Sequence, residues 1–271
     1  DGGLIVGGKH IPVTRRPNNE WDWADRGVDI VVETTGKITQ RDDLAGHLDC
    51  GAKKVIISAP GKNPDVTIVM GVNEEVYDPE KHFVISAASC TTNCLAPATK
   101  VIMDNFGIKH GLMTTIHSYT MGQRILDGSD KDLRRGRAAA MSMIPTSTGA
   151  ARATGLVIPA LQGKMDGISV RVPTPVVSMV DVVYELERDT SKEEVNSVLK
   201  AAVPAMKGSL GVSEEPLVSI DYTGDTHGGV VDSLCTAVMD KRMLQQPIWY
   251  DNEAGSTHQL VRLMNMVGAS L

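Results

Sequence analysis

The sequence predicts an α/β unit with a parallel sheet, followed by an α+β domain with a mixed, mainly antiparallel sheet. The first prediction rests on short β-branched runs at residues 28–33, 54–58, 67–71 and 82–86, with a helical pattern at residues 41–48. Short apolar strands with helical connections are typical of βαβ units. The second prediction rests on longer β-rich segments at residues 111–119, 167–173, 176–186 and 230–239.

Helices are expected between and after these β-rich segments. Residues 95–106 form an apolar helical pattern, and residues 256–267 form the last helix of the chain. Residues 191–205 form another, in which Ser191 is suited to the N-cap because Glu194 follows three residues later. This spacing is that of a capping box.

Composition excludes several classes of protein. The chain has 271 residues, 42% of them hydrophobic, and a formal net charge of -6, so it lacks the basic surface that nucleic-acid binding requires. The longest apolar runs are strand-sized, well short of the roughly 20 residues of a membrane helix. Four cysteines do not suggest a disulfide scaffold, and their spacing fits no zinc site. We therefore expect no nucleic-acid partner, no membrane span and no metal.

Cys90 is a candidate nucleophile because it follows a strand and begins a helix. The free N–H groups and the positive end of the helix dipole stabilise a thiolate and could bind an oxyanion. Position alone fits a small core cysteine equally well, and we interpret Cys94, one turn deeper, in that way.

His117 is a candidate base at the end of the strand that comes after this helix. A single histidine at a strand end is more often structural. Beside an activated cysteine, however, an imidazole can accept the thiol proton.

Five blocks occur in order along the chain: SAASCTTNCLAP at residues 86–97, TTIHSYT at 114–120, LRRGRAAAMSMIPTSTGAA at 133–151, VRVPTPVVSMVD at 170–181 and WYDNEAG at 249–255. Together they resemble the signatures of the phosphorylating glyceraldehyde-3-phosphate dehydrogenases. The resemblance implies a Rossmann-type nucleotide-binding domain, incomplete at its N-terminus, formed by residues 1–89 and 249–271. It implies a catalytic domain at residues 90–248.

The resemblance also implies the chemistry. Cys90 matches the nucleophile that forms a hemithioacetal and then a thioester, and His117 matches the base. The residues matching the binding groups for inorganic phosphate are Ser89, Thr91, Thr148 and Gly149. Those matching the groups around the phosphate of glyceraldehyde 3-phosphate are Thr120, Arg137 and Arg171. A solvated basic face is the alternative for Arg137, whereas Arg171 within an apolar strand needs an anion.

For the cofactor, NAD or NADP, Asn252 matches the residue that fixes the nicotinamide carboxamide. Thr35, Gly36 and Ser58 match strand-end residues near the dinucleotide, and Arg16 is a looser match on the adenine side. No G-x-G-x-x-G follows a strand in this sequence. Since that loop anchors the pyrophosphate, we expect the sequence to be a fragment of a longer chain.

Some positions depart from the family pattern. Gly122 stands where Asp is frequent, Ser129 where Pro is common, and Ala254 and Ser256 replace a Trp and a Tyr. Ser129 favours NADP or dual use, and the lost aromatics reduce packing beside the nicotinamide. A catalytically impaired paralogue with an interaction role and an erythrose-4-phosphate dehydrogenase are the alternatives. The family pattern further implies a homotetramer in the cytoplasm, or in a plastid for a carbon-fixation form.

Overall fold

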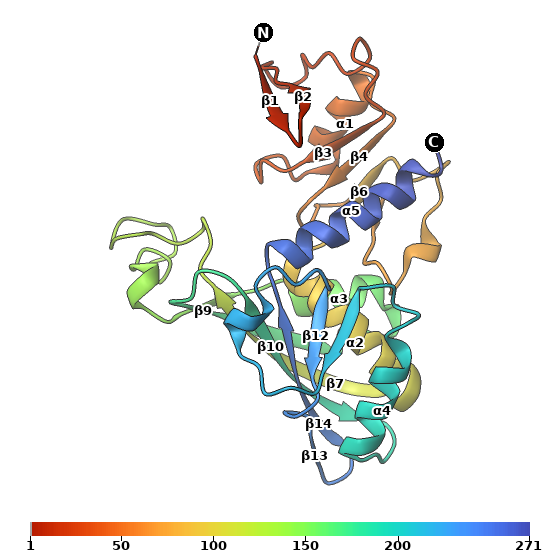
Figure 1. The fold of residues 1–271 in the computed structure, drawn as a ribbon, viewed down its shortest axis with the longest axis vertical. Coiled ribbons are helices and arrows are strands. Elements are labelled where there is room, and N and C mark those ends of the chain that lie inside the picture. Colours follow the sequence, from red (N-terminus) through yellow and green to blue (C-terminus); the bar gives the residue numbers. More distant parts are fainter. Residues whose placement is uncertain (1) are drawn as a thin grey trace.

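The computed structural model describes residues 2–271, which form two sheets with their helices and an N-terminal hairpin (Figure 1). The first sheet is parallel throughout and has the order β3-β4-β6-β5. Its strands are β3 (Ile30–Glu33), β4 (Lys54–Ile57), β5 (Val66–Thr67) and β6 (Val84–Ser86). Helix α1 (Arg41–Asp49) connects β3 to β4, and α5 (Ala254–Gly268), from the other end of the chain, packs on the same sheet. The expected parallel α/β unit is confirmed.

Strand β4 shows why these segments read as continuous apolar runs. Val55 and Ile57 pack with Leu44 of α1 on one face of the sheet. Ile56, between them, packs with Leu263 of α5 on the opposite face. Both faces of a parallel sheet are covered in this way, so successive residues are buried rather than alternating with polar ones.

The expected strand at residues 67–71 is much shorter in the structure, because β5 ends at Thr67. Asn73 takes the backbone groups that would have continued the strand. Its Oδ1 accepts a hydrogen bond from the N–H of Val69 at 2.9 Å, and its Nδ2 donates to the carbonyl oxygen of Thr67, also at 2.9 Å. The side chain therefore closes a turn where apolar composition alone suggested a strand.

The second sheet has eight strands, with the order β11-β12-β14-β10-β7-β9-β8 and with β13 paired to β14. Its strands are β7 (Ile108–Ser118), β8 (Ile144–Ser147), β9 (Met165–Val172), β10 (Ser178–Leu186), β11 (Leu210–Ser213), β12 (Gly229–Asp232), β13 (Ala237–Met239) and β14 (Met243–Tyr250). The β7/β9 and β11/β12 pairs are parallel and the others are antiparallel. The expected mixed, mainly antiparallel sheet is confirmed.

The β-rich segment at residues 230–239 forms two strands rather than one. β12 ends at Asp232, whose Oδ1 accepts hydrogen bonds from the N–H groups of Leu234 and Cys235, both at 3.2 Å. This carboxylate therefore makes the turn that precedes β13.

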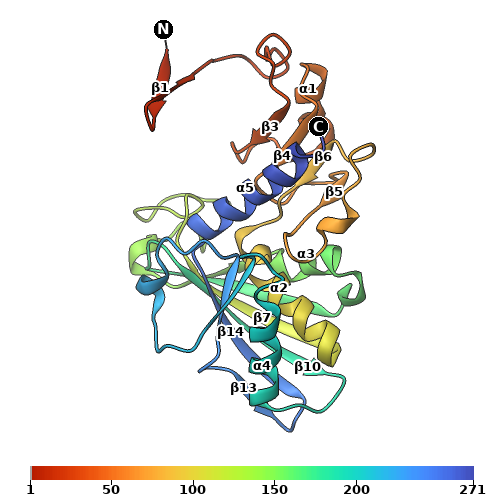
Figure 2. The same cartoon turned by 45° about the vertical axis from the view of Figure 1, so that its right-hand side comes forward.

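Three helices contribute to the main apolar core beside this sheet: α2 (Cys90–Phe106), α3 (Ala150–Val157) and α4 (Lys192–Ala202). Figure 2 shows α2 and α4 lying together against the strands. Helix α2 is central, because most of its residues are buried, among them Leu95, Ile102 and Phe106. Cys90 thus begins a helix whose larger part lies in the core.

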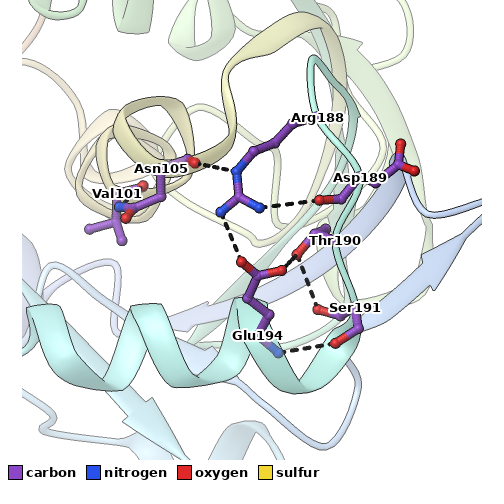
Figure 3. A network of polar contacts seen from close by, with 7 residues as sticks. All are labelled: Val101, Asn105, Arg188, Asp189, Thr190, Ser191 and Glu194. Carbon is purple, nitrogen blue, oxygen red and sulfur yellow. Dashed lines mark hydrogen bonds and ion pairs between the residues drawn. The ribbon is translucent and has the colours of Figure 1, made fainter.

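A polar network fixes the far end of α2 (Figure 3). The Nε of Arg188 donates to the carbonyl oxygen of Asn105 at 2.7 Å, and its Nη2 pairs with Glu194 Oε1 at 2.9 Å. A guanidinium near a helix C-terminus satisfies carbonyls that have no partner within the helix. Ser191 is the N-cap of α4, as expected, and its hydroxyl accepts from the N–H of Glu194 at 3.3 Å.

Two further features concern the domain division. β14 remains in the second sheet up to Tyr250, so residues 249 and 250 lie with that sheet and α5 begins only at Ala254. The N-terminal hairpin of β1 (Gly3–Val6) and β2 (Lys9–Pro12) extends away from both sheets (Figure 2). Within residues 2–271, no helix has the length and apolar character needed to span a bilayer.

Candidate active site

The strand-to-helix connection between β6 and α2 presents Cys90. Ser89 is the N-cap, and its hydroxyl accepts a hydrogen bond from the N–H of Thr92 at 3.1 Å. Ala88, just before it, has a φ of +58°, a left-handed conformation that residues other than glycine seldom adopt. Asn93 holds this turn, since its Nδ2 donates to the carbonyl oxygens of Ala87 at 2.8 Å and Ser89 at 3.0 Å. Such a strained backbone persists because its surroundings fix it.

Cys90 and His117 face each other across the connection. His117 is buried near the end of β7, and its Nε2 lies 3.5 Å from the Sγ of Cys90. This is hydrogen-bond distance for a sulfur donor, so the imidazole is placed to accept the thiol proton. The two candidates that position in the sequence could not join are therefore in contact.

The second nitrogen of His117 determines which tautomer this contact uses. Nδ1 lies 2.7 Å from the carbonyl oxygen of Ser118, and the tautomer with its proton on Nδ1 donates to that oxygen and turns the lone pair of Nε2 toward Cys90. The other tautomer has its proton on Nε2 and accepts at Nδ1 from Arg171. The Nη1 of Arg171 lies 2.8 Å from the same Nδ1 and donates to the Ser118 carbonyl oxygen at 3.2 Å.

The environment keeps both members of the pair neutral. Burial, reinforced by the charge of Arg171, lowers the pKa of His117 to about 4. Burial also raises the pKa of the Cys90 thiol, while Thr91 and the charge of Arg171 act in the opposite direction. The sequence suggested that the helix start would lower the Cys90 pKa, but desolvation outweighs that effect here. These shifts favour thiol and neutral imidazole over the ion pair, so Nε2 has no proton of its own to lose at neutral pH when Nδ1 is protonated.

Tyr250 supports both partners, and no sequence motif distinguished it as a site residue. Its buried hydroxyl bonds to Thr91 Oγ1 at 2.9 Å and to Thr115 Oγ1 at 2.8 Å. Its ring meets the imidazole of His117 edge to face, with 5.9 Å between the ring centroids. A tyrosine that ends β14 thus connects the first turn of α2 to β7.

Comparisons with known proteins agree with this geometry. Residues 89–252 match the sequence profile of the family described as "Glyceraldehyde 3-phosphate dehydrogenase, C-terminal domain". The glyceraldehyde-3-phosphate dehydrogenase of Geobacillus stearothermophilus is 59% identical over 96% of this chain and 78% of its own length. Glyceraldehyde-3-phosphate dehydrogenase 1 of Bacillus subtilis is 56% identical over 96% of this chain and 78% of its own.

The chain belongs to the glyceraldehyde-3-phosphate dehydrogenase family. The family expected from the sequence motifs is confirmed, and with it the enzyme class, an oxidoreductase. Members of this family use NAD or NADP.

The candidate phosphate-binding hydroxyls differ in how free they are. Ser89 is engaged as the helix cap, and Thr91 is engaged with Tyr250. Thr148 Oγ1 accepts from the N–H of Ala150 at 3.2 Å. Gly149 is the exposed N-cap of α3, with no atom within 4 Å of the position that a Cβ would take. The accessible part of this group is therefore the open start of α3.

Arg171 and Thr120 lie beside His117, whereas Arg137 does not. Arg171 is paired with His117 in the register of β7 and β9, and its Nη1 lies 3.5 Å from Thr120 Oγ1. Arg137 is exposed, with its guanidinium 3.2 Å from the carboxylate of Asp127. The sequence assignment of Arg137 to this group is therefore corrected, because the path of the loop directs it outward.

Arg135, in the same basic run, is the arginine whose charge acts on Arg171. Its Nε donates to Thr146 Oγ1 at 3.0 Å, and its charge contributes to lowering the pKa of Arg171, although burial is the larger cause. The sequence could not distinguish the arginines at positions 134, 135 and 137, because all lie in one short basic run. Pairing of Thr146 with Ser169, two residues before Arg171, brings Arg135 toward the site.

The candidate cofactor residues fall into three places. Thr35, Gly36 and Ser58 follow β3 and β4, so they share the carboxyl edge of the parallel sheet. Gly36 has a φ of +69° and open space around the position of a Cβ. Asn252 lies between β14 and α5, where its Oδ1 accepts from Ser178 Oγ at 3.0 Å. Arg16 is exposed and pairs with Asp22 at 3.4 Å. The structure does not bring Arg16 to the other four residues.

A cleft of about 1010 Å³ is lined mainly by residues 119–126 of the loop after His117, together with Ala139, Ala140, Pro175 and Glu253, and neither Cys90 nor His117 is part of its lining. Its walls thus include the residues that follow His117 and the neighbour of Asn252. A cavity of about 1180 Å³ elsewhere is lined by the β4–β5 connection and the far half of α2, away from Cys90 and His117.

Proposed function

We propose that this protein oxidises glyceraldehyde 3-phosphate in the presence of inorganic phosphate to 1,3-bisphosphoglycerate. The observation that carries the proposal is the 3.5 Å contact between Cys90 Sγ and His117 Nε2 at the start of α2. As the sulfur attacks the aldehyde carbon, the thiol proton passes to Nε2 and the hemithioacetal forms as its alkoxide, which needs to lose only hydride to become a thioester. The N–H groups at the start of α2 stabilise the negative charge that develops on the aldehyde oxygen.

The residues fit a nicotinamide cofactor. Asn252 has its Oδ1 occupied by Ser178, and within the described residues its Nδ2 has no hydrogen-bond partner, so a donor is left for a carboxamide oxygen. Bound NAD or NADP would supply the hydride acceptor that oxidation of the hemithioacetal to a thioester requires. Thr35, Gly36 and Ser58 at the sheet edge would hold the dinucleotide, as ligands bind at the carboxyl ends of parallel strands.

Two phosphate groups have candidate donors. Arg171 and Arg135 carry like charges that approach each other, which is favourable when an anion lies between them. Arg171 Nε is also buried without a hydrogen-bond partner in the described part of the chain. We assign these two residues and Thr120 to the substrate phosphate. Thr148 and Gly149 at the start of α3 are assigned to inorganic phosphate, whose attack on the thioester carbon releases Cys90 as thiolate and forms the acyl phosphate.

A cytoplasmic homotetramer is part of the proposal, and its support is family membership. The division into residues 1–89 with 249–271 and residues 90–248 is likewise proposed, with the boundary at Tyr250 adjusted to the end of β14.

The direct test is to find the acyl group. The protein is incubated with glyceraldehyde 3-phosphate and NAD or NADP without phosphate, and peptides are examined by mass spectrometry. A thioester on the peptide containing Cys90 is expected, lost on addition of phosphate and absent from Cys90→Ser. Acylation of Cys50 or Cys235 instead, or persistence in Cys90→Ser, would contradict the assignment. Comparing the two cofactors identifies the one that is used.

A further inference from the structure

Ser178 lies between the strand of the base and the segment of Asn252. It is the first residue of β10, which is hydrogen-bonded to β7 on one side and β14 on the other. β7 carries His117 near its end, and β14 leads directly into Asn252. The Ser178 side chain is buried, at 2% exposure. The buried hydroxyl of Ser178 therefore lies between the strand that carries His117 and the segment that carries Asn252.

The hydrogen bonds of Ser178 fix the orientation of the Asn252 amide. Ser178 Oγ accepts from the N–H of Ser118 at 3.0 Å and donates to Asn252 Oδ1 at 3.0 Å. The hydroxyl has one proton, and a buried proton needs an acceptor. If the amide were reversed, its Nδ2 would face Ser178 and the hydroxyl proton would lose its acceptor. The oxygen of Asn252 therefore faces Ser178, and the Nδ2 donor faces away from it.

The position of Ser178 is itself tightly constrained. Val177 has a φ of +68°, which a β-branched residue adopts only where its surroundings hold it. Ser118 Oγ donates to the Val177 carbonyl oxygen at 2.7 Å, so residue 118 is bound to residues 177 and 178 in both directions. On the other side, Asp251 Oδ1 accepts from the N–H groups of Glu253 and Ala254, which fixes the backbone around Asn252.

We propose that Ser178 is a positioning residue that holds the Asn252 amide with its Nδ2 toward the carboxamide oxygen of the nicotinamide. The inference rests on the proposed function, in which Asn252 binds that carboxamide. The nicotinamide ring can take two orientations that differ by a half-turn about its bond to the ribose. The Nδ2 donor of Asn252, fixed on one side of the ring, favours the orientation that brings the carboxamide oxygen to that side. Ser178 thereby determines which face of the ring meets the carbon attached to Cys90. It also ties that choice to the strand of His117.

The test separates the nicotinamide from the rest of the dinucleotide. Isothermal calorimetry gives the Kd values of wild type and Ser178→Ala for the dinucleotide that the wild type binds, NAD or NADP. It also gives their Kd values for the corresponding ADP-ribose (with the 2′-phosphate if the dinucleotide is NADP), which lacks only the nicotinamide. Loss of one buried hydrogen bond predicts about tenfold weaker dinucleotide binding. Binding of the ADP-ribose is expected to stay unchanged. A purely structural role would weaken both ligands together.

A stereochemical readout and a control complete the design. With deuterated aldehyde, wild type is expected to label one face of the ring, and Ser178→Ala to give a mixture detectable by NMR. Ser233→Ala is the matched control, because Ser233 is also buried and donates to the Ser213 carbonyl oxygen at 2.6 Å, far from the site. It should change neither readout. If Ser178→Ala does not fold, Ser178→Cys keeps the shape with a weaker donor and is expected to shift both readouts in the same direction.

The outcomes distinguish this inference from the proposed function. An unchanged ratio of the two Kd values and unchanged labelling in the Ser178 variant would overturn the role of Ser178 while the dehydrogenase remains. If wild type binds the ADP-ribose and the dinucleotide equally, nicotinamide recognition by Asn252 is overturned. If wild type binds neither ligand, cofactor binding by this chain fails, and the inference fails with it.

Discussion

Replacing Tyr250 by Phe removes one oxygen atom and breaks two buried hydrogen bonds. The hydroxyl joins Thr91 and Thr115, which are 4% and 0% exposed, so both would keep a hydroxyl without this partner. Each hydroxyl left unsatisfied costs about 1–3 kcal/mol. We expect Tyr250→Phe to lower the free energy of unfolding by about 2–3 kcal/mol, which corresponds to a fall in Tm of about 5–10 °C for a chain of this size. Because Thr91 follows Cys90, turnover is expected to fall as well.

A second tyrosine provides a matched comparison. Tyr222 is 4% exposed and stacks on Trp249, but in the described part of the chain its hydroxyl has no hydrogen-bond partner. Tyr222→Phe is therefore expected to leave the free energy of unfolding unchanged or to raise it by up to about 1 kcal/mol. Both variants are measured by urea and thermal unfolding beside wild type.

The result that would refute the reasoning is an equal effect of the two substitutions. A third variant tests the cause directly. Thr115→Val added to Tyr250→Phe removes one of the stranded hydroxyls, so it should recover about 1 kcal/mol. If the double variant is less stable than Tyr250→Phe alone, the destabilisation does not come from unsatisfied hydroxyls.

Three further predictions follow from named side chains. Because the pKa of His117 falls to about 4 on folding, the unfolded state binds more protons between pH 6.5 and that value, and stability is lost as the pH falls through this range. This loss in the free energy of unfolding approaches about 3 kcal/mol. Urea unfolding at each pH should show it in wild type and not in His117→Gln, and equal losses in both proteins would contradict the lowered pKa. Ser169 Oγ is buried and unpaired among the described residues, so Ser169→Ala should raise the free energy of unfolding by about 1 kcal/mol, and destabilisation of that size would reveal a missed bond. Arg135→Ala should raise the KM for glyceraldehyde 3-phosphate by tenfold or more, about the loss of one charge-assisted hydrogen bond, whereas exposed Arg137→Ala should change it little; the reverse order in steady-state kinetics would restore Arg137 to the site.

Several elements were predictable because their signals are local. The Ser191 cap depends on its own N-terminal turn, and the buried run of β4 depends on a sheet covered on both faces. The turn at Asn73 was missed because the apolar composition of residues 67–71 predicts a strand. The side-chain amide of Asn73 instead bonds the backbone groups of Thr67 and Val69 that would have continued it. Polar side chains that replace ladder hydrogen bonds leave no periodic signal.

For the candidate site, the sequence by itself indicated two candidates, a cysteine at a helix start and a histidine near a strand end, and it was the family motifs that joined them as a pair. The tertiary structure decided which other side chains meet that pair. Tyr250 is 133 residues beyond His117 and reaches it through the order of the strands β14, β10 and β7. Ser178 gains its place from the same order, and Arg135 rather than Arg137 approaches Arg171 because of the path of one loop. Local sequence sets the conformation of a turn or a cap, but strand order and loop path depend on how the whole chain buries its apolar surface.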